Sequence, residues 1–595
     1  MHTHDRSVDD IFYFAIPASL KPHFLIKPFS FLIALSPSHH LLEFTKETRR
    51  RKNMSFPPSE IIKNRFLGFL IWQSISSTII FFLCKICLLS FFSPNPFSLS
   101  FYSIIAFVIF QISLLCFSSS LYYLSSPQPK QPASFPELAL SLGRFLLNSV
   151  VGGGSSDLFT PNVRNRVNTT LGFMIFVLFS GLWGSLSIVS LCRNSYSFDE
   201  QRLVGLGFRG FLFGLIYGLH YVYNKRWVLV FPIIQRTSLF SFKMGVPSAI
   251  KEAVKLSSVS FLCSALLVVL LPHYFNNQNN IGRFIAEQII FYIGSSAVSL
   301  CWELSHHLHQ VFHTKRCTFA PSKGSAAAET NPSEPLLAAL EESTPRSLLQ
   351  YLAYLDLCMV CDSNVDLWRR AAFFEESGET YKRVIAVCLR PVEDLTSKLA
   401  DGLEGSSVDK SDQISHQLRS PTDTRSDAKL HQAFNDSQLY VWCVRTAASL
   451  TARSHKDDRF GVAQIAGCNA SVVSTLLSCL LAVEACMGKK TNLQAPHLMG
   501  AANIKWAPLH NSGRREGPTA TTGKKRGGPL HAKAYAMADV LRTSLYIIVS
   551  EFHSEMIGSA KTGILEDWIV TSKPLYSTRD ILVQKLGLFL EYRAC

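Results

Sequence analysis

The chain has 595 residues, of which 48% are apolar and only 17% are charged, and this balance excludes an average soluble protein. Its formal net charge of +15 favours an anionic partner, and we expect lipid head groups rather than nucleic acid because the excess lies in loops and tails. The 15 cysteines have no regular spacing and several lie inside apolar segments, so we interpret them as reduced side chains.

The first 53 residues differ from the rest of the chain. Their apolar run, residues 11–35, is interrupted by three prolines and two lysines, so no uninterrupted stretch of about 20 residues is available to cross a bilayer. Four basic residues, 49–52, then precede a second methionine, Met54. We predict a disordered extension over residues 1–53 and hypothesise that Met54 is the usual start, which N-terminal peptide mapping would decide.

Six apolar segments follow, and they predict an all-α fold with a six-helix transmembrane bundle in residues 54–316. The predicted spans are 66–89, 101–124, 170–191, 203–223, 256–271 and 284–304. Arg209 lies inside the fourth span, where an arginine costs ~2.5–3.5 kcal/mol unless it finds a partner. The fifth span is short unless it begins near Ala249. Before the third span, residues 137–151 could form an amphipathic helix on the membrane surface.

The stretch from Leu203 to Leu271 fixes the orientation of the other spans. Its two apolar segments enclose a basic loop with a single acid, Glu252. We expect six basic residues of this loop to contact the membrane surface: Lys225, Arg226, Arg236, Lys243, Lys251 and Lys255. Under the positive-inside rule such a loop stays on the cytosolic side, so the sequence predicts that both termini face the cytoplasm or nucleoplasm.

Glycines in the fourth span form a regular stripe. Gly210, Gly214 and Gly218 recur every four residues, which places them on one helix face where another helix can pack closely. The stripe favours ordinary packing within the bundle, and a seam between two copies of the chain is the alternative.

The chain after the sixth span has the charge density of a soluble protein. Residues 317–335 read as a linker, and 336–595 as a soluble α-helical domain with flexible inserts at 401–427 and 491–529. The apolar run 472–483 is only about a dozen residues long, which favours a buried helix of this domain over a seventh span.

Two groups of possible metal ligands need an explanation. His306, His307, His309 and His313 follow the sixth span, but no further ligand pair stands nearby, and histidines at a helix end often contact its last carbonyls. The pair Cys358-x-x-Cys361 has no second pair at zinc spacing. The sequence also has no phosphate-binding loop, nucleophile elbow or zinc-protease motif. We therefore predict no metal, no cofactor and no enzymatic activity.

Two basic clusters lie in the second insert. Arg514-Arg515 and Lys524-Lys525-Arg526 have the spacing of a bipartite nuclear import signal. A solvated or lipid-contacting linker would have the same composition, and the sequence leaves both interpretations of residues 514–526 open.

Four segments resemble the nuclear-division-cycle family of transmembrane nucleoporins. They are the entry to the first span (63–68), part of the basic loop (229–236), residues 373–378, and residues 539–546 near the C-terminus. The resemblance rests on the order of these segments together with the six-span architecture, and it covers about residues 54–595.

The resemblance implies a protein that anchors the nuclear pore complex where the inner and outer nuclear membranes fuse. It implies that the C-terminal domain faces the pore and binds scaffold and other membrane nucleoporins, and that the protein supports pore assembly, and so nucleocytoplasmic transport. No catalytic residues belong to the family. Two alternatives remain open: a multi-span transporter or channel of the endoplasmic reticulum, which would need a polar path, and a membrane-bound lipid enzyme using the histidine cluster.

Overall fold

The computed structural model describes residues 58–594 with gaps, the longest being 93–100, 144–160, 194–199, 271–280, 408–429 and 489–528. The predicted extension 1–53, the basic clusters at 514–526 and the second half of the predicted surface helix therefore lie outside the described residues. Within the described part, the regular elements are helices, with one isolated β-bridge between Ser126 and Val228 and no strand. The predicted all-α fold is confirmed.

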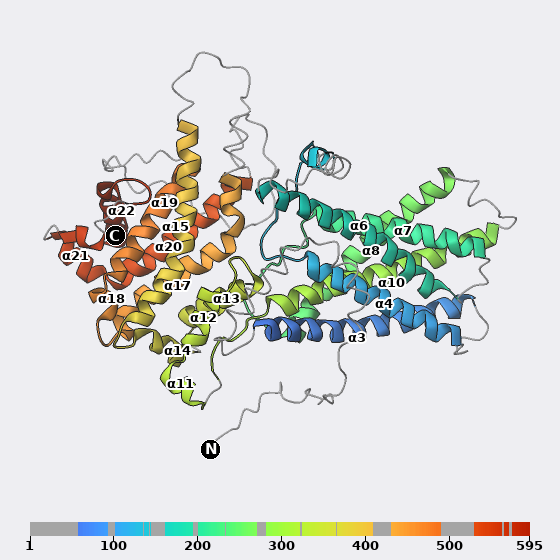
Figure 1. Ribbon diagram of the computed structural model, residues 1–595, viewed down its shortest axis with the longest axis horizontal. Coiled ribbons are helices and arrows are strands. Elements are labelled where there is room, and N and C mark those ends of the chain that lie inside the picture. The colour runs from blue at the N-terminus through green and yellow to red at the C-terminus, as the bar shows by residue number, and fades with distance from the viewer. Residues whose placement is uncertain are drawn as a thin grey trace, which may run out of the picture. The chain divides into compact units, whose positions relative to one another are not determined.

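Six long helices form the N-terminal part of the described chain. They are α3 (Pro58–Phe92), α4 (Phe101–Leu124), α6 (Pro161–Cys192), α7 (Glu200–Tyr223), α8 (Ser238–Leu270) and α10 (Ile281–Thr314). Figure 1 shows them side by side, and each covers one predicted span except for Leu271, which is not described. Aromatic rings fill the centre of this bundle: Phe117 stacks on Trp302 with ring centroids 4.1 Å apart, and Phe213 lies 5.3 Å from the same indole.

In the described part of the chain, six helices are long and apolar enough to cross a membrane: α3, α4, α6, α7, α10 and α19 (Cys468–Cys486). Of the apolar stretch of α19, 78% is buried, against 22–50% in the other five. Protein rather than lipid therefore surrounds α19, which forms a core helix of the C-terminal part. Helix α8 is not among the six, and it bears three charged residues, Lys251, Glu252 and Lys255, just before its apolar end.

The C-terminal part is a second set of packed helices. These are α11 (Ala326–Thr330), α12 (Glu334–Glu342), α13 (Leu348–Asp362), α14 (Leu367–Ala371), α15 (Glu379–Ser407), α17 (Ser437–Asp457), α18 (Val462–Ile465), α19, α20 (Pro529–Glu551), α21 (His553–Lys561) and α22 (Arg579–Ala594), with 3-10 turns η5 (Ala372–Phe374), η7 (Phe434–Asp436) and η8 (Ile564–Trp568). Helix α19 packs against α15 and α20, and α13 packs against α17. These contacts bury the apolar stripes of each helix.

Two predicted boundaries differ from the observed helices. Residues 401–407, which we assigned to a flexible insert, continue α15, because Gly402 is buried against Leu430 and the helix gains a packing partner there. The predicted linker 317–335 contains α11 and the first residues of α12. Both differences arise because polar composition alone does not show which short helices find a neighbour to pack against.

Candidate functional site

The loop between α7 and α8 lies between the six-helix bundle and the C-terminal helices. We call the surrounding region the junction: residues 226–236 of the loop, residues 310–319 at and after the end of α10, and the residues of α13, α14, η7 and α17 that they contact. The junction joins the apolar bundle to the domain with the composition of a soluble protein, so its rigidity decides whether the two parts act together.

A buried carboxylate lies at the centre of the junction. Asp356 of α13 is fully buried, and it accepts hydrogen bonds from Arg316 Nε and Arg369 Nη2, each at 2.7 Å, and from the Phe319 N–H at 2.9 Å. Arg316 also donates to Asp366 at 2.6 Å. Burial by itself lowers the pKa of Arg316, but the two carboxylates outweigh it and raise that pKa above its ordinary value. The chain leaving α10 is thereby fixed to α13 and α14.

The ring of Phe231 joins the loop to the C-terminal helices. It stacks on Tyr351 of α13 with centroids 5.8 Å apart and meets the edge of Trp442 of α17 at 5.4 Å. The backbone carbonyl of Phe231 accepts a hydrogen bond from Gln438 Nε2 at 2.7 Å. A buried aromatic side chain of this kind contributes more to holding two parts together than a typical surface contact does.

Amide side chains hold the loop against α10. Gln310 donates to the carbonyl of Val228 at 3.1 Å and accepts from the N–H of Val230 at 3.2 Å. Gln235 accepts from the N–H of Arg316 at 3.0 Å. Because the loop has no regular structure of its own, these side chains supply the partners that its backbone groups require.

The entry to the first span also reaches the end of α10. Arg65 of α3 donates to the carbonyls of Phe312 and His313 at 2.9 and 3.2 Å, where the last carbonyls of α10 lack helical partners. A Cβ at Gly68 would lie 3.1 Å from the ring of Phe312. The segment 63–68 therefore meets the end of α10 next to the junction, and the segment 229–236 lies within it.

Arg226 occupies a different place from the one expected of a membrane-surface residue. Its guanidinium forms a bidentate ion pair with the buried carboxylate of Glu303 on α10, with N···O distances of 2.6 and 2.5 Å. This pair fixes the start of the loop to the bundle, so the charge of Arg226 is neutralised inside the protein. The arginine–carboxylate geometry explains why a basic residue of the loop is turned inward.

The other five predicted surface cations, Lys225, Arg236, Lys243, Lys251 and Lys255, are all exposed. Helices α8 and α10 run antiparallel, with Gly245 against the ring of His307 and the Ser257 hydroxyl bonded to that of Ser296 at 3.1 Å. This register places Lys251 and Lys255 beside the predicted sixth span, where a lysine reaches head groups only by extending along the helix. Membrane-surface contact by the five residues stays a prediction.

The glycine stripe of α7 lies against α6. A Cβ at Gly210 would lie 3.0 Å from the Cα of Ser185, and one at Gly218 would lie 3.1 Å from the Cα of Val177. At Gly214 it would collide with the carbonyl oxygen of Ser180. The two backbones approach so closely that side chains larger than hydrogen would separate the helices, as expected of small-residue packing in membranes.

The charged residues inside the spans have partners. Arg209 donates to Ser264 of α8 and to Gln288 of α10, each at 2.7 Å, and lies 4.0 Å from the ring centroid of Phe291. Lys85 donates to the carbonyl of Arg193 beyond the end of α6 at 2.6 Å. These contacts offset the cost of burying a cation in the bundle.

The histidine cluster is packed among aromatic rings. His309 and His313 stack with centroids 4.2 Å apart, and Phe69 of α3 meets both rings edge-on. His313 Nδ1 lies 2.9 Å from the carbonyl of His309. Across the described residues, no group of three or more His, Cys, Asp or Glu side chains is placed to hold a metal ion.

Both cysteines of the C-x-x-C pair lie inside α13. Cys358 and Cys361 are buried, and burial raises the pKa of both thiols, to about 12 for Cys358 and well above the ordinary value for Cys361. A redox-active or metal-binding cysteine needs the opposite shift, because the thiolate is the reactive form. The geometry therefore agrees with a packing role.

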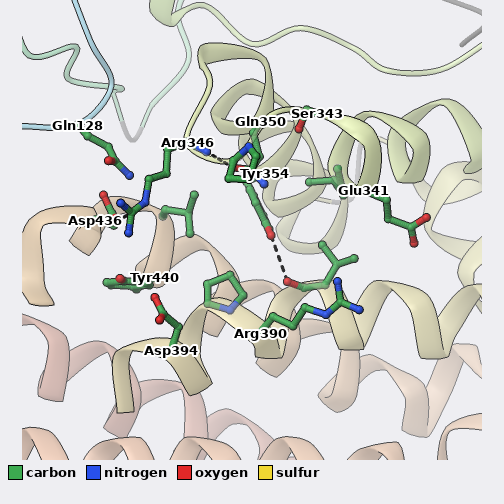
Figure 2. A pocket seen from close by; sticks show the side chains of 15 residues that line it. Gln128, Glu341, Ser343, Arg346, Gln350, Tyr354, Arg390, Asp394, Asp436 and Tyr440 are labelled. Atoms are coloured by element: carbon green, nitrogen blue, oxygen red, sulfur yellow. Dashed lines mark hydrogen bonds and ion pairs between the residues drawn. The ribbon is translucent and has the colours of Figure 1, made fainter. Parts of the chain in front are cut away.

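A cavity of about 310 Å³ opens between α13, α15 and α17. Figure 2 shows Arg346 next to Asp436, with Tyr440 and Asp394 below them and Arg390 further along the wall. Burial raises the pKa of Asp436, and the nearby Arg346 guanidinium, at 3.7 Å, opposes that shift. Because the lining mixes both signs of charge, the cavity does not indicate one class of ligand.

Sequence reasoning missed the residues on which the junction depends most. Asp356 was visible as a lone acid within the apolar helix 348–361, and a charge in that position signals a buried partner. Its partners Arg316 and Arg369 are 40 and 13 residues away along the chain, so spacing alone did not connect them.

Two comparisons with known proteins were informative in different ways. A search of curated proteins gives no match. A family model described as nucleoporin protein Ndc1-Nup matches residues 63–432, which includes the six long helices and α11 to α15. Three of the four resembling segments, 63–68, 229–236 and 373–378, lie inside the matched range. Because the match covers more than half of the chain, this protein belongs to the Ndc1-Nup family of nucleoporins.

Proposed function

We propose that this nucleoporin anchors the nuclear pore complex in the pore membrane, where the inner and outer nuclear membranes fuse, and that it supports pore assembly and so transport. Family membership supports a role at the nuclear pore, and the family is structural rather than enzymatic. The observation that supports anchoring is the junction, in which Asp356 and Phe231 hold the C-terminal helices to the apolar bundle. Rigid attachment transmits load from a bound scaffold to the membrane.

In this proposal α3, α4, α6, α7, α8 and α10 are the six spans, and residues 317–595 lie on the cytosolic or nucleoplasmic side together with the N-terminus. The charge distribution of the loops supports this orientation. The register of α8 against α10 favours a fifth span that begins near Ala249 rather than at 256, because Gly245 lies level with His307, just past the predicted end of the sixth span.

The C-terminal helices would bind scaffold and other membrane nucleoporins. Large apolar side chains stand exposed between α17 and α19, among them Phe460 and Ile465, the latter 85% exposed. Exposed apolar side chains that gather in one segment favour a protein contact over a catalytic site. Anionic membrane lipids would be the second class of partner.

The test is localisation of a fluorescently tagged copy starting at Met54, combined with proximity labelling from its C-terminus. We expect a punctate nuclear rim and scaffold nucleoporins among the labelled proteins. A copy that ends at residue 316 serves as the control, which should enter the membrane without labelling the scaffold. A diffuse reticular pattern of the full chain without nucleoporins would contradict the proposal.

A further inference from the structure

A second cavity, of about 200 Å³, lies at the edge of the bundle next to the junction. Its walls come from the loop between α7 and α8, the first turn of α8, and the last turns of α10. Two cations, Arg236 and Lys315, line it, and no acidic residue does. A cavity with only positive charge in its walls favours an anionic ligand.

No described residue neutralises the two cations. Neither Arg236 nor Lys315 forms an ion pair with a described residue, and both side chains are exposed. The acids nearby have other partners: Asp356 and Asp366 accept from Arg316, and Glu252 pairs with Lys255 at 3.5 Å. The Arg236 guanidinium lies 5.2 Å from the ring centroid of Phe240, which holds it next to the cavity.

The amide and imidazole side chains of the cavity have partners within the protein. Gln310 bonds to Val228 and Val230 through its two amide atoms, and Gln235 bonds to Pro232 and Arg316 through both of its own. The His307 ring nitrogen lies 3.1 Å from the carbonyl of Ser241. These side chains are therefore held in place by the protein, while the two cations still lack a negative partner among the described residues.

The end of the cavity nearest the bundle lies at the depth of lipid head groups if α10 crosses the membrane, a step that rests on the proposed function. A helix rises 1.5 Å per residue, so His307 and Gln310 are about 5 and 9 Å beyond Leu304, the predicted end of the sixth span. Lys315 is about 16 Å beyond Leu304, so its long side chain would have to extend back toward the bilayer to meet a head group. The polar layer of a bilayer extends roughly 5–8 Å beyond the hydrocarbon on each side.

Exposed apolar side chains accompany the cavity. Val230, which lines it, is 68% exposed, and Ile234 and Leu239, the sequence neighbours of the lining residues Gln235 and Ser238, are 66% and 65% exposed. A free phosphate ion gains nothing from such neighbours, whereas the acyl chains of a lipid would cover them. The combination of unpaired cations with an exposed apolar rim distinguishes a lipid from a soluble anion.

We propose that this cavity binds the phosphate group of an anionic phospholipid, with Arg236 and Lys315 as its charged ligands. The site would fix one lipid next to the junction, and so set the position of the loop that carries Phe231 relative to the membrane surface. It differs from diffuse attraction of the whole basic loop, because only two of the exposed cations take part.

The test is lipid binding by the purified full chain in detergent, measured by native mass spectrometry against short-chain phosphatidic acid, phosphatidylcholine and inorganic phosphate. We expect one tightly bound phosphatidic acid, and weaker binding of it by roughly 10- to 30-fold in the double variant Arg236→Gln, Lys315→Gln. Both side chains are exposed, so thermal unfolding of this variant should match that of the wild type.

The matched control is the double variant Lys251→Gln, Lys255→Gln. It removes the same charge from exposed lysines of α8 that do not line the cavity, and its affinity for phosphatidic acid should remain that of the wild type. Equal weakening in both double variants would overturn the site in favour of diffuse charge. Absence of saturable binding would also overturn it, as would inorganic phosphate that binds as tightly as the lipid.

The lipid site and the pore-anchor proposal fail in distinguishable ways. Localisation of the wild-type chain away from the nuclear rim would contradict anchoring while leaving the measured lipid affinity intact. If the binding experiment shows no specific lipid site and the wild-type chain is still found at the nuclear rim, only the inference drawn from the cavity is contradicted.

Discussion

Asp356 is the residue that the junction depends on most. Two hydrogen bonds from Arg369, one from Arg316 and one from the backbone of Phe319 converge on its carboxylate. Replacing Asp356 by Asn leaves the buried Arg369 without its main counter-charge and leaves Arg316 with Asp366 alone, and we expect a loss of about 3–5 kcal/mol of folding free energy. Thermal unfolding of the full chain in detergent measures this loss.

The control for Asp356 is Arg383, whose ion pairs with Glu334 and Glu341 are largely exposed. Arg383→Ala should cost at most about 1 kcal/mol, because solvent screens such pairs. Equal losses of folding free energy in the two variants would show that burial does not strengthen the ion pairs of Asp356.

Glu484 gives the protein a defined dependence on acid. It is buried in α19 and accepts from Arg542 of α20 and from Lys585 of α22. Burial favours the protonated carboxyl, but the two cations outweigh it and hold the pKa of Glu484 below its ordinary value of 4.5. The stabilisation is therefore complete above pH 4.5 and is lost as pH falls through the lower, folded-state pKa.

We therefore expect Glu484→Gln to be less stable than the wild type near neutral pH and to lose less stability on acidification. Unfolding temperatures measured between pH 7 and about pH 3.5 test this. If the unfolding temperatures of the variant and the wild type fell in parallel with pH, Glu484 would not be the source of the acid sensitivity.

At the scale of elements, the contact between α6 and α7 depends on glycine. Gly214→Ala would push a methyl group against the carbonyl oxygen of Ser180, and overpacking of this kind costs about 1–3 kcal/mol. Gly172→Ala, on α6, is the matched control, since nothing lies within 4 Å of its Cβ position. We expect a lower unfolding temperature only for Gly214→Ala, and similar values for the two variants would argue against close packing.

The loop between α7 and α8 acts as a connecting element through one aromatic ring. Phe231→Ala removes a buried ring between Tyr351 and Trp442, and we expect a loss of about 3–5 kcal/mol. Limited proteolysis should then cut residues 317–335 faster, because the C-terminal helices are held less firmly. Val230→Ala, at an exposed neighbouring position, should leave the cleavage rate unchanged, and a similar increase there would contradict the role of Phe231.

At the scale of the whole molecule, the proposed orientation predicts which segments meet the lumen. An engineered Asn-x-Thr acceptor in the connector 193–202 should be glycosylated, because the proposed orientation places that connector on the lumenal side. The same acceptor at Gly324, in the predicted linker, should not be. Gel mobility before and after glycosidase treatment shows whether each acceptor is glycosylated. Glycosylation at Gly324 but not in the connector would contradict the proposed orientation.

The sequence by itself determined the helical class, the order of the six long apolar helices and the family resemblance. Hydropathy and helical periodicity are local properties, so they are readable without knowing what packs against what. Hydropathy alone is misleading for α19, because this helix is as apolar as a membrane span. Only the short length of its apolar core suggested the buried position that the structure shows.

The tertiary structure decided which polar residues act together. Arg226 and Arg236 belong to one basic loop and look equivalent in sequence, yet Arg226 is neutralised by Glu303, 77 residues away, while Arg236 lines an unneutralised cavity. Asp356 likewise finds its partners only through folding. The physical reason is that the energy of a charge depends on its burial and on the distance to other charges, and both are set by how distant segments pack.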